Sequence, residues 1–299
     1  QLNAVKSDEG KLLDEFHFLL EECSRQFSGQ MAIQRNELGQ VQGLLGEAIN
    51  SLTGSFTNMH ENTQRQRDVT MTRWGTFGQP VIIFPTAGGD AEEIERMHMV
   101  TVLRPLIDAG RIKVYSCDSV AGMGLVKSEG TPRHRMWLQN QFHHYVRHEA
   151  VPAIRADCQT ADVPIWAAGA SFGAFHAVAV TCRFPDVFPR AVALSGTYDL
   201  RRFFQAGPAE FTSEFWVSSP LHFVPTLSGY HLDVLQKRFI LMASGEGRAE
   251  DIDESWAMAR VLGAKGIPNR VDNWGPSWPH DWDTWRKMLP QYLDEWTKG

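Results

Sequence analysis

One stretch near the middle of the chain limits the possible folds more than any other. Residues 163–177 read VPIWAAGASFGAFHA, which is an apolar run, a Gly-x-Ser-x-Gly pattern and an Ala-rich run. Small residues at Gly169 and Gly173 let a strand and a helix cross closely around Ser171, and such a turn pushes the serine into the open. The stretch therefore predicts a buried strand, a sharp turn and a helix, with Ser171 as a candidate nucleophile.

The residues on both sides of this stretch predict a sheet with helices around it. Short apolar runs alternate with longer helical patterns from about Asp68 to the C-terminus, which is typical of a mainly parallel sheet with helices on both faces. We expect strands at 69–72, 81–84, 112–117, 163–168, 191–194, 238–243 and 269–274. We expect helices at 91–109, 132–156 with an interruption near Pro152, 171–182, 250–262 and 282–296, and an irregular segment at 197–235.

The first 68 residues have a different composition. All fifteen prolines lie between Pro80 and Pro290, and all ten tryptophans lie between Trp74 and Trp296. Apolar residues before this region recur mostly three or four apart, which is the heptad spacing of a coiled-coil helix or helical hairpin. We therefore expect two parts, a helical segment at 1–68 and an α/β domain at 69–299. Because an apolar helical stripe needs a partner, this segment is a candidate for homo-oligomerisation.

Composition narrows the partners and the compartment. The net charge of −6 and the scattered Lys and Arg residues argue against a nucleic-acid partner, because phosphate binding needs a basic surface. No apolar run approaches the length of a membrane span, and the N-terminus lacks the pattern of a signal peptide. The four cysteines have no metal-type spacing, so we expect free thiols and a reducing cytoplasm.

A serine nucleophile needs a base and an acid, and loops after the later strands are where such groups gather in parallel sheets. His280 follows the last predicted strand and is the only histidine beyond residue 231, so it is the candidate base. The loop after the preceding predicted strand contains the three carboxylates of Glu246, Glu250 and Asp251. Position alone does not choose among the three.

Four features together resemble a known family. They are the FPTAGG turn at 84–89, the Gly-x-Ser-x-Gly elbow, the SGTYD segment at 195–199 and the HDW run at 280–282 before a Trp-rich helix. Residues 69–299 resemble an α/β-hydrolase of the esterase group that includes esterase D-like proteins and, more distantly, the mycolyltransferases. The resemblance implies an α/β-hydrolase fold and a triad in the chain order serine, acid, histidine.

The resemblance also implies site residues. It favours Glu250 over Asp251 and Glu246 as the acid, because the family's acid lies at the end of a Gly-rich loop. It implies an oxyanion hole made by the backbone N–H of Phe172 and by one from the turn at Thr86 and Ala87.

The segment at 1–68 falls outside that resemblance. Its run LLGEAI at 44–49, followed by Leu52 and Phe56, resembles a helical part of a bacterial methyl-accepting chemotaxis receptor. This likeness implies that a helical signalling or assembly segment is fused to a hydrolase.

The sequence thus predicts a carboxylesterase-type serine hydrolase that acts on a small-molecule ester through Ser171, His280 and Glu250. An acyltransferase would use the same triad, and a non-catalytic hydrolase-fold module for assembly or signalling is the alternative of another class. We expect no cofactor and no metal. His144 and His148 lie one helical turn apart, but no third ligand is evident, and Gly122-Met123-Gly124 lacks the context of a dinucleotide site.

Overall fold

The computed structural model describes residues 69–204 and 206–298, and six helical residues of the N-terminal part: Glu21, Arg25, Gln26, Gly29, Met31 and Leu38. The chain divides into two units, Gln1–Arg67 and Asp68–Gly299. The predicted heptad segment lies almost entirely outside the described residues, so its coiled-coil character and its role in assembly stay predictions.

The second unit is built on a seven-stranded sheet with the order β1-β3-β2-β4-β5-β6-β7. Only β1 runs antiparallel to its neighbour, β3, and every other pair of neighbours is parallel. The strands are β1 (Met71–Trp74), β2 (Gln79–Phe84), β3 (Ile112–Cys117), β4 (Trp166–Ala170), β5 (Arg190–Leu194), β6 (Phe239–Gly245) and β7 (Asn269–Gly275). The predicted α/β-hydrolase architecture is confirmed.

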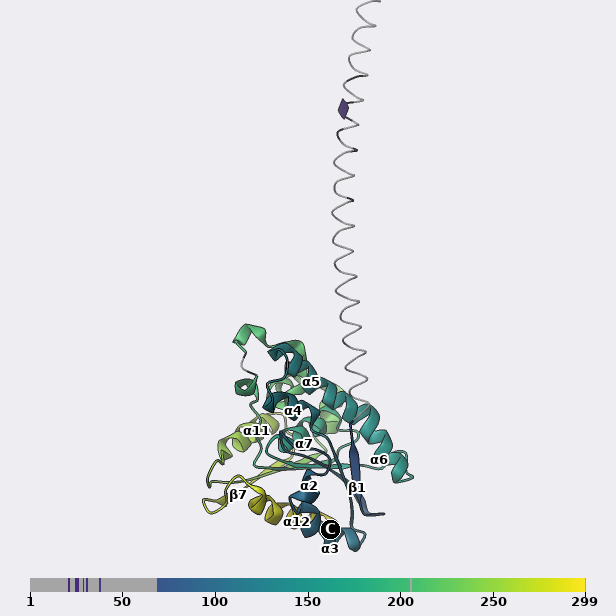
Figure 1. The fold of residues 1–299 in the computed structure, drawn as a ribbon, viewed down its shortest axis with the longest axis vertical. Helices are drawn as coiled ribbons and strands as arrows, with labels where there is room; N and C mark the ends of the chain where they lie inside the picture. Colours follow the sequence, from purple (N-terminus) through teal and green to yellow (C-terminus); the bar gives the residue numbers. More distant parts are fainter. Residues whose placement is uncertain are drawn as a thin grey trace, which may run out of the picture. The chain divides into compact units, whose positions relative to one another are not determined.

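Helices connect the strands and cover both faces of the sheet (Figure 1). They are α2 (Glu93–Arg96), α3 (Met99–Asp108), α4 (Val120–Val126), α5 (Pro132–Tyr145), α6 (Val151–Asp157), α7 (Phe172–Arg183), α8 (Ser213–Ser218), α9 (Pro220–Phe223), α10 (Gly229–Leu235), α11 (Ile252–Ala264) and α12 (Trp282–Lys298). Three short 3₁₀ turns, η2 (Arg201–Phe203), η3 (Pro208–Glu210) and η4 (Val224–Thr226), lie in the excursion between β5 and β6.

The sheet separates two apolar layers, and alternate residues of each strand belong to opposite layers. Ile82 faces the layer that includes α5, α6, α7 and α11, whereas Val81 faces the layer of α3 and α12. Figure 1 shows α2, α3 and α12 on one side of the sheet and α4, α5 and α7 on the other. Because the central strands are buried on both faces, they read as continuous apolar runs in the sequence.

Two of the long predicted helices are interrupted in the structure. The helix predicted at 91–109 is divided into α2 and α3, because His98 adopts φ 60°, which a continuous helix cannot accommodate. The predicted interruption near Pro152 is a π-helical turn, η1 (Val146–Ala150), that directly precedes α6. A proline lacks the N–H that would continue the helical ladder, and the wider turn takes up the mismatch.

The segment predicted to be irregular, 197–235, contains several short helices and 3₁₀ turns. The helix predicted at 250–262 begins only at Ile252, so Glu250 lies in the loop before α11. This shift of two residues matters for the site, because a loop residue can turn its carboxylate toward the edge of the sheet.

Candidate active site

The Gly-x-Ser-x-Gly stretch forms a sharp turn between β4 and α7. Ser171 has φ 56° and ψ −118°, which is rare for a residue with a side chain and marks a strained position. A Cβ on Gly169 would lie 2.3 Å from the Gly173 backbone, and a Cβ on Gly173 would lie 2.2 Å from the Phe84 carbonyl oxygen. Neither position accepts a side chain, so both glycines are needed for the close crossing of strand and helix.

The structure brings His280 to this serine. His280 lies between β7 and α12, and its Nε2 is 3.0 Å from Ser171 Oγ. Its backbone N–H donates to the Arg248 carbonyl at 3.0 Å, and its ring meets the Trp285 ring edge-on with centroids 5.1 Å apart. The first contact holds the backbone of His280, and the second packs against its imidazole.

The structure also brings Glu250 to His280, with Glu250 Oε2 3.3 Å from His280 Nδ1. The Glu250 side chain is only 1% exposed. Burial alone would raise its pKa, but hydrogen bonds from His280 and two serines hold the pKa below its usual value. An ionised carboxylate only accepts, so Nδ1 carries the proton and Nε2 is free to accept from the serine hydroxyl.

The two other carboxylates of the loop lie elsewhere. Glu246 is exposed, and its Oε1 accepts a hydrogen bond from Asn273 Nδ2 at 2.8 Å. Asp251 is exposed at the start of α11. Neither is within hydrogen-bond distance of His280.

Two serines donate to the Glu250 carboxylate, and the sequence assigned neither of them this role, although Ser195 begins the SGTYD segment. Ser195 Oγ donates to Glu250 Oε1 at 2.5 Å, and Ser244 Oγ donates to Oε2 at 3.0 Å. Trp285 Nε1 in turn donates to Ser195 Oγ at 2.9 Å. Ser195 directly follows β5 with φ 47°, so its place at the end of a parallel strand was the available signal.

The predicted oxyanion donors differ in their availability. Phe172 is the first residue of α7, and first-turn amides of a helix have no partner within the helix. The N–H of Thr86 donates to Glu93 Oε2 at 2.7 Å, and its hydroxyl donates to Glu93 Oε1 at 2.6 Å. The Thr86 amide is therefore engaged. Ala87 follows Thr86 in the same turn, and a hydrogen bond from the Gly89 N–H to the Thr86 carbonyl closes this turn at 3.0 Å.

Glu93 is a further residue that the sequence did not reveal. Burial raises its pKa despite the opposing hydrogen bonds from Thr86. A Cβ on Gly89 would lie 2.3 Å from its carboxylate, so the glycine leaves room for Glu93 against the turn. The carboxylate thereby fixes the backbone that precedes Ala87.

The residues that the structure describes offer little to a metal ion. Within 69–204 and 206–298, no three His, Cys, Asp or Glu side chains gather as a metal site would require. His144 and His148 stack on each other with ring centroids 5.8 Å apart. In the same described ranges, no helix has the length and apolar character needed to cross a membrane.

Comparison with known proteins agrees with this architecture. Residues 93–295 match the family described as "Putative esterase", and the chain belongs to that family. The search of curated proteins gave no match. The chemotaxis-receptor likeness of residues 1–68 lies outside the matched range and stays a prediction.

Solved structures share the fold at low sequence identity. An S-formylglutathione hydrolase from Agrobacterium tumefaciens is 10% identical with a TM-score of 0.55, covering 77% of this chain and 89% of that one. A ferulic acid esterase is 17% identical with a TM-score of 0.54, covering 77% and 92%. The dipeptidyl peptidase 4 of Porphyromonas gingivalis is 14% identical with a TM-score of 0.52, but only 33% of that chain is covered. At these identities the likeness establishes the fold alone.

Proposed function

We propose that this protein is a serine hydrolase that cleaves carboxylic esters through an acyl-enzyme on Ser171. His280 takes the proton of the Ser171 hydroxyl as its oxygen attacks the ester carbonyl, and it passes this proton to the departing alcohol. Water then attacks the acyl group with the same histidine as base, which releases the acid and restores the serine. Glu250 keeps the proton on Nδ1 and stabilises the imidazolium.

One observation carries this proposal: Ser171 Oγ, His280 and the buried Glu250 carboxylate form a continuous hydrogen-bonded chain with distances of 3.0 and 3.3 Å. It starts at a strained serine and ends at a carboxylate with three donors. Structural ion pairs do not require a serine with φ 56°, whereas a nucleophile on an elbow does.

The developing oxyanion would lie against two backbone N–H groups, those of Phe172 and Ala87. Preorganised amides in a site that excludes water supply a large share of the rate in acyl transfer. Since Glu93 already binds the Thr86 amide, we assign the second donor of the turn to Ala87.

Hydrolysis of a series of neutral 4-nitrophenyl esters of increasing acyl length tests the proposal. Ser171→Ala and His280→Ala should each lower kcat by about 10⁴-fold to 10⁶-fold while circular dichroism stays unchanged. A Ser171→Ala protein that keeps more than about a tenth of the wild-type rate would contradict the proposed nucleophile.

The same assay separates the neighbouring chemistries. Adding alcohols as acceptors detects acyl transfer, because a transferase forms a new ester faster than free acid. Matched 4-nitroanilides detect peptidase-like cleavage. We expect the free acid as the main product and esters as the faster substrates.

Cys117, Cys158 and Cys182 are free thiols, which supports the proposed cytoplasmic location.

A further inference from the structure

A cavity of about 490 Å³ lies in the excursion between β5 and β6, and its lining has two kinds of wall. One wall is apolar and includes Ala206, Phe211 and Trp216. The other wall carries four charged side chains: Asp199, Arg201, Arg202 and Glu254. Pockets of this size with a mixed lining bind small molecules that are part apolar and part charged.

The apolar wall continues to the residues around Ser171. Phe172, whose amide is a proposed oxyanion donor, belongs to a buried apolar cluster with Phe204 and Phe215. Ala87, Ala206 and Phe211 pack against this same cluster. The cavity wall and both oxyanion residues are therefore parts of one packed unit.

The charged wall is likewise tied to the residues that hold Glu250. Asp199 lies four residues after Ser195, the hydrogen-bond donor to Glu250 Oε1. Glu254 lies four residues after Glu250, in the first turn of α11, and its Oε2 accepts the N–H groups of Tyr198 and Asp199 at 2.7 and 2.9 Å. The cavity therefore adjoins the C-terminal edge of the sheet from which the site is built.

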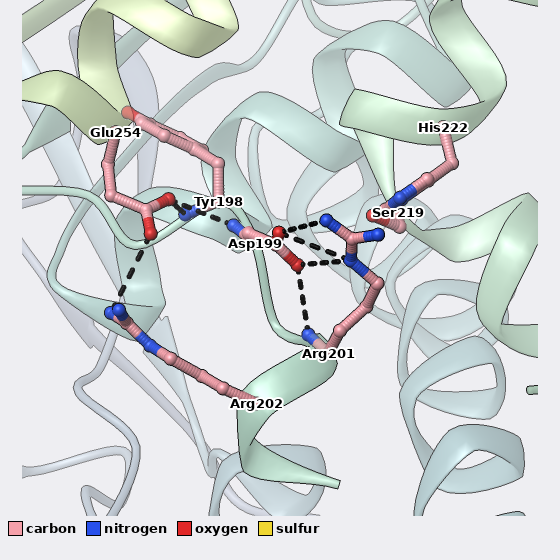
Figure 2. Close-up of polar contacts among 7 residues, drawn as sticks. All are labelled: Tyr198, Asp199, Arg201, Arg202, Ser219, His222 and Glu254. Atoms are coloured by element: carbon pink, nitrogen blue, oxygen red, sulfur yellow. Dashed lines mark hydrogen bonds and ion pairs between the residues drawn. The ribbon is translucent and has the colours of Figure 1, made fainter. Parts of the chain in front are cut away.

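The two arginines differ in how firmly they are held (Figure 2). Arg201 donates two hydrogen bonds to Asp199, with Nε–Oδ1 and Nη2–Oδ2 distances of 2.9 and 2.5 Å, so its guanidinium is already paired with a carboxylate. Arg202 has only Glu254 Oε1 at 3.6 Å as its ion-pair partner within the described residues, which is beyond hydrogen-bond distance. Its side chain is 57% exposed, and its guanidinium lies 5.0 Å from the centre of the Phe203 ring.

Arg202 is thus an exposed cation with free donors in the lining of a cavity that also has apolar and aromatic residues. A guanidinium has five N–H donors in a fork that fits a carboxylate bidentately. Trp216 belongs to the apolar part of the lining, and its ring meets that of His222 edge-on, with ring centroids 4.8 Å apart. The His222 ring is fixed in turn by Ser219 Oγ, 2.7 Å from Nδ1 (Figure 2).

We propose that this cavity binds the part of the substrate that carries both an aromatic or alkyl body and a carboxylate, with the carboxylate on Arg202. The inference rests on the proposed function and specifies its substrate class as acidic esters. The carboxylate can belong to the acyl group or to the alcohol, and the test distinguishes the two.

The first measurement uses a matched pair of inhibitors against hydrolysis of neutral 4-nitrophenyl butyrate. 3-Phenylpropanoate and 3-phenylpropanamide have the same body and differ in charge. We expect competitive inhibition, with a Ki for the acid about tenfold or more below that of the amide, as one bidentate Arg–carboxylate contact supplies. Equal Ki values in the wild type would overturn the proposal.

Variants then assign the effect. Arg202→Gln should abolish the preference for the acid, measured as the ratio of the Ki of the acid to the Ki of the amide in the same variant. Arg202→Lys should keep part of the preference. Arg260→Gln should leave the preference for the acid intact. It makes the same change of charge on an exposed face of α11 that does not line this cavity. Trp216→Ala should raise the Ki of the acid and the Ki of the amide alike, because it removes apolar lining and leaves the charge of Arg202. A preference that survives in Arg202→Gln would overturn the proposal.

Two substrate pairs locate the carboxylate. 4-Nitrophenyl octanoate and the mono-4-nitrophenyl ester of octanedioic acid place the charge on the acyl side. Methyl 4-acetoxycinnamate and 4-acetoxycinnamate place it on the alcohol side. One pair should show a higher kcat/KM for the anionic member that depends on Arg202, and absence of this effect in both pairs would overturn the substrate assignment.

The failure of the proposed function is distinguishable from the failure of this inference. If no ester is hydrolysed, the proposed function fails, and calorimetric titration with the same acid and amide still tests the cavity. Preferential binding of the acid that is lost in Arg202→Gln would then support the cavity alone, and equal binding of both would refute it.

Discussion

Replacing Glu250 by Gln tests the geometry of the site at the acid, which position in the sequence alone did not separate from Glu246 and Asp251. The carboxylate receives three donors, from Ser195 at 2.5 Å, Ser244 at 3.0 Å and His280 at 3.3 Å. A glutamine has nearly the same shape but only one acceptor oxygen, so its NH₂ must face at least one of these donors. The substitution therefore disturbs hydrogen bonding without opening a cavity.

The two orientations of the amide have different consequences. With NH₂ near His280, Nδ1 must accept, the ring proton moves to Nε2, and His280 can no longer take the proton of Ser171. With NH₂ near Ser195, the tautomer survives, but no negative charge stabilises the imidazolium. The first orientation also turns NH₂ toward Ser244, which bonds the same oxygen as His280, whereas the second turns it toward Ser195 alone. Either orientation therefore lowers the rate, by the wrong tautomer or by the lost charge.

We therefore expect the kcat of Glu250→Gln to fall by about 10³-fold to 10⁴-fold, as in serine hydrolases whose acid is replaced by its amide. The KM for a neutral 4-nitrophenyl ester should change by less than about threefold, because Glu250 is buried behind His280. Steady-state kinetics on a purified variant with an unchanged circular dichroism spectrum measures both quantities.

Matched variants of the same loop are the controls. Glu246→Gln and Asp251→Asn remove carboxylates that are exposed and do not reach His280, so each should keep kcat within about threefold. A Glu250→Gln enzyme with more than about a tenth of wild-type kcat, or a larger loss in either control, would refute the reasoning.

Three further predictions concern other parts of the chain. Glu93→Gln should weaken the hydrogen bond that holds the Thr86 amide and lower kcat about tenfold with little change in KM, a smaller fall in kcat than the loss of an oxyanion donor would cause. Glu95 is exposed, so Glu95→Gln should leave kcat unchanged in the same assay. Burial lowers the pKa of His176 to about 3, below the 6.5 of an unfolded chain, so the unfolded state binds a proton at this residue first as the pH falls. The free energy of unfolding, measured with urea, should therefore be unaffected by His176 above about pH 6.5 and should fall by about 2 kcal/mol by pH 5. His176→Phe should remove this part of the pH dependence. A protein lacking residues 1–68 should hydrolyse esters at the full rate per active site, but its mass by light scattering should be that of a smaller assembly. A folded but inactive truncated protein would contradict the independence of the two parts.

The strands and the elbow could be predicted because their physical causes are local in the sequence. Strands buried on both faces leave continuous apolar runs, and the crossing of β4 and α7 needs glycine at Gly169 and Gly173. His280 stood out for a similar reason, since it follows the last strand and has no competitor beyond residue 231.

The acid and the oxyanion turn depend on contacts between distant segments. Three carboxylates share one loop, and their directions depend on a backbone that includes Ala249 at φ 64° and on donors from Ser195 and Ser244. The capture of the Thr86 amide by Glu93 is a tertiary contact that no periodicity encodes. Residue spacing finds candidates for such sites, but packing selects among them.

Covalent labelling of Ser171 tests the central proposal most directly. An alkyl fluorophosphonate reacts with a serine only when a neighbouring base activates it, and it forms a stable adduct that intact-mass spectrometry detects. We predict one adduct per chain, on the peptide that contains Ser171, with labelling abolished in Ser171→Ala and slowed strongly in His280→Ala and Glu250→Gln. An unlabelled wild-type protein, or labelling that persists in Ser171→Ala, would contradict the proposed nucleophile.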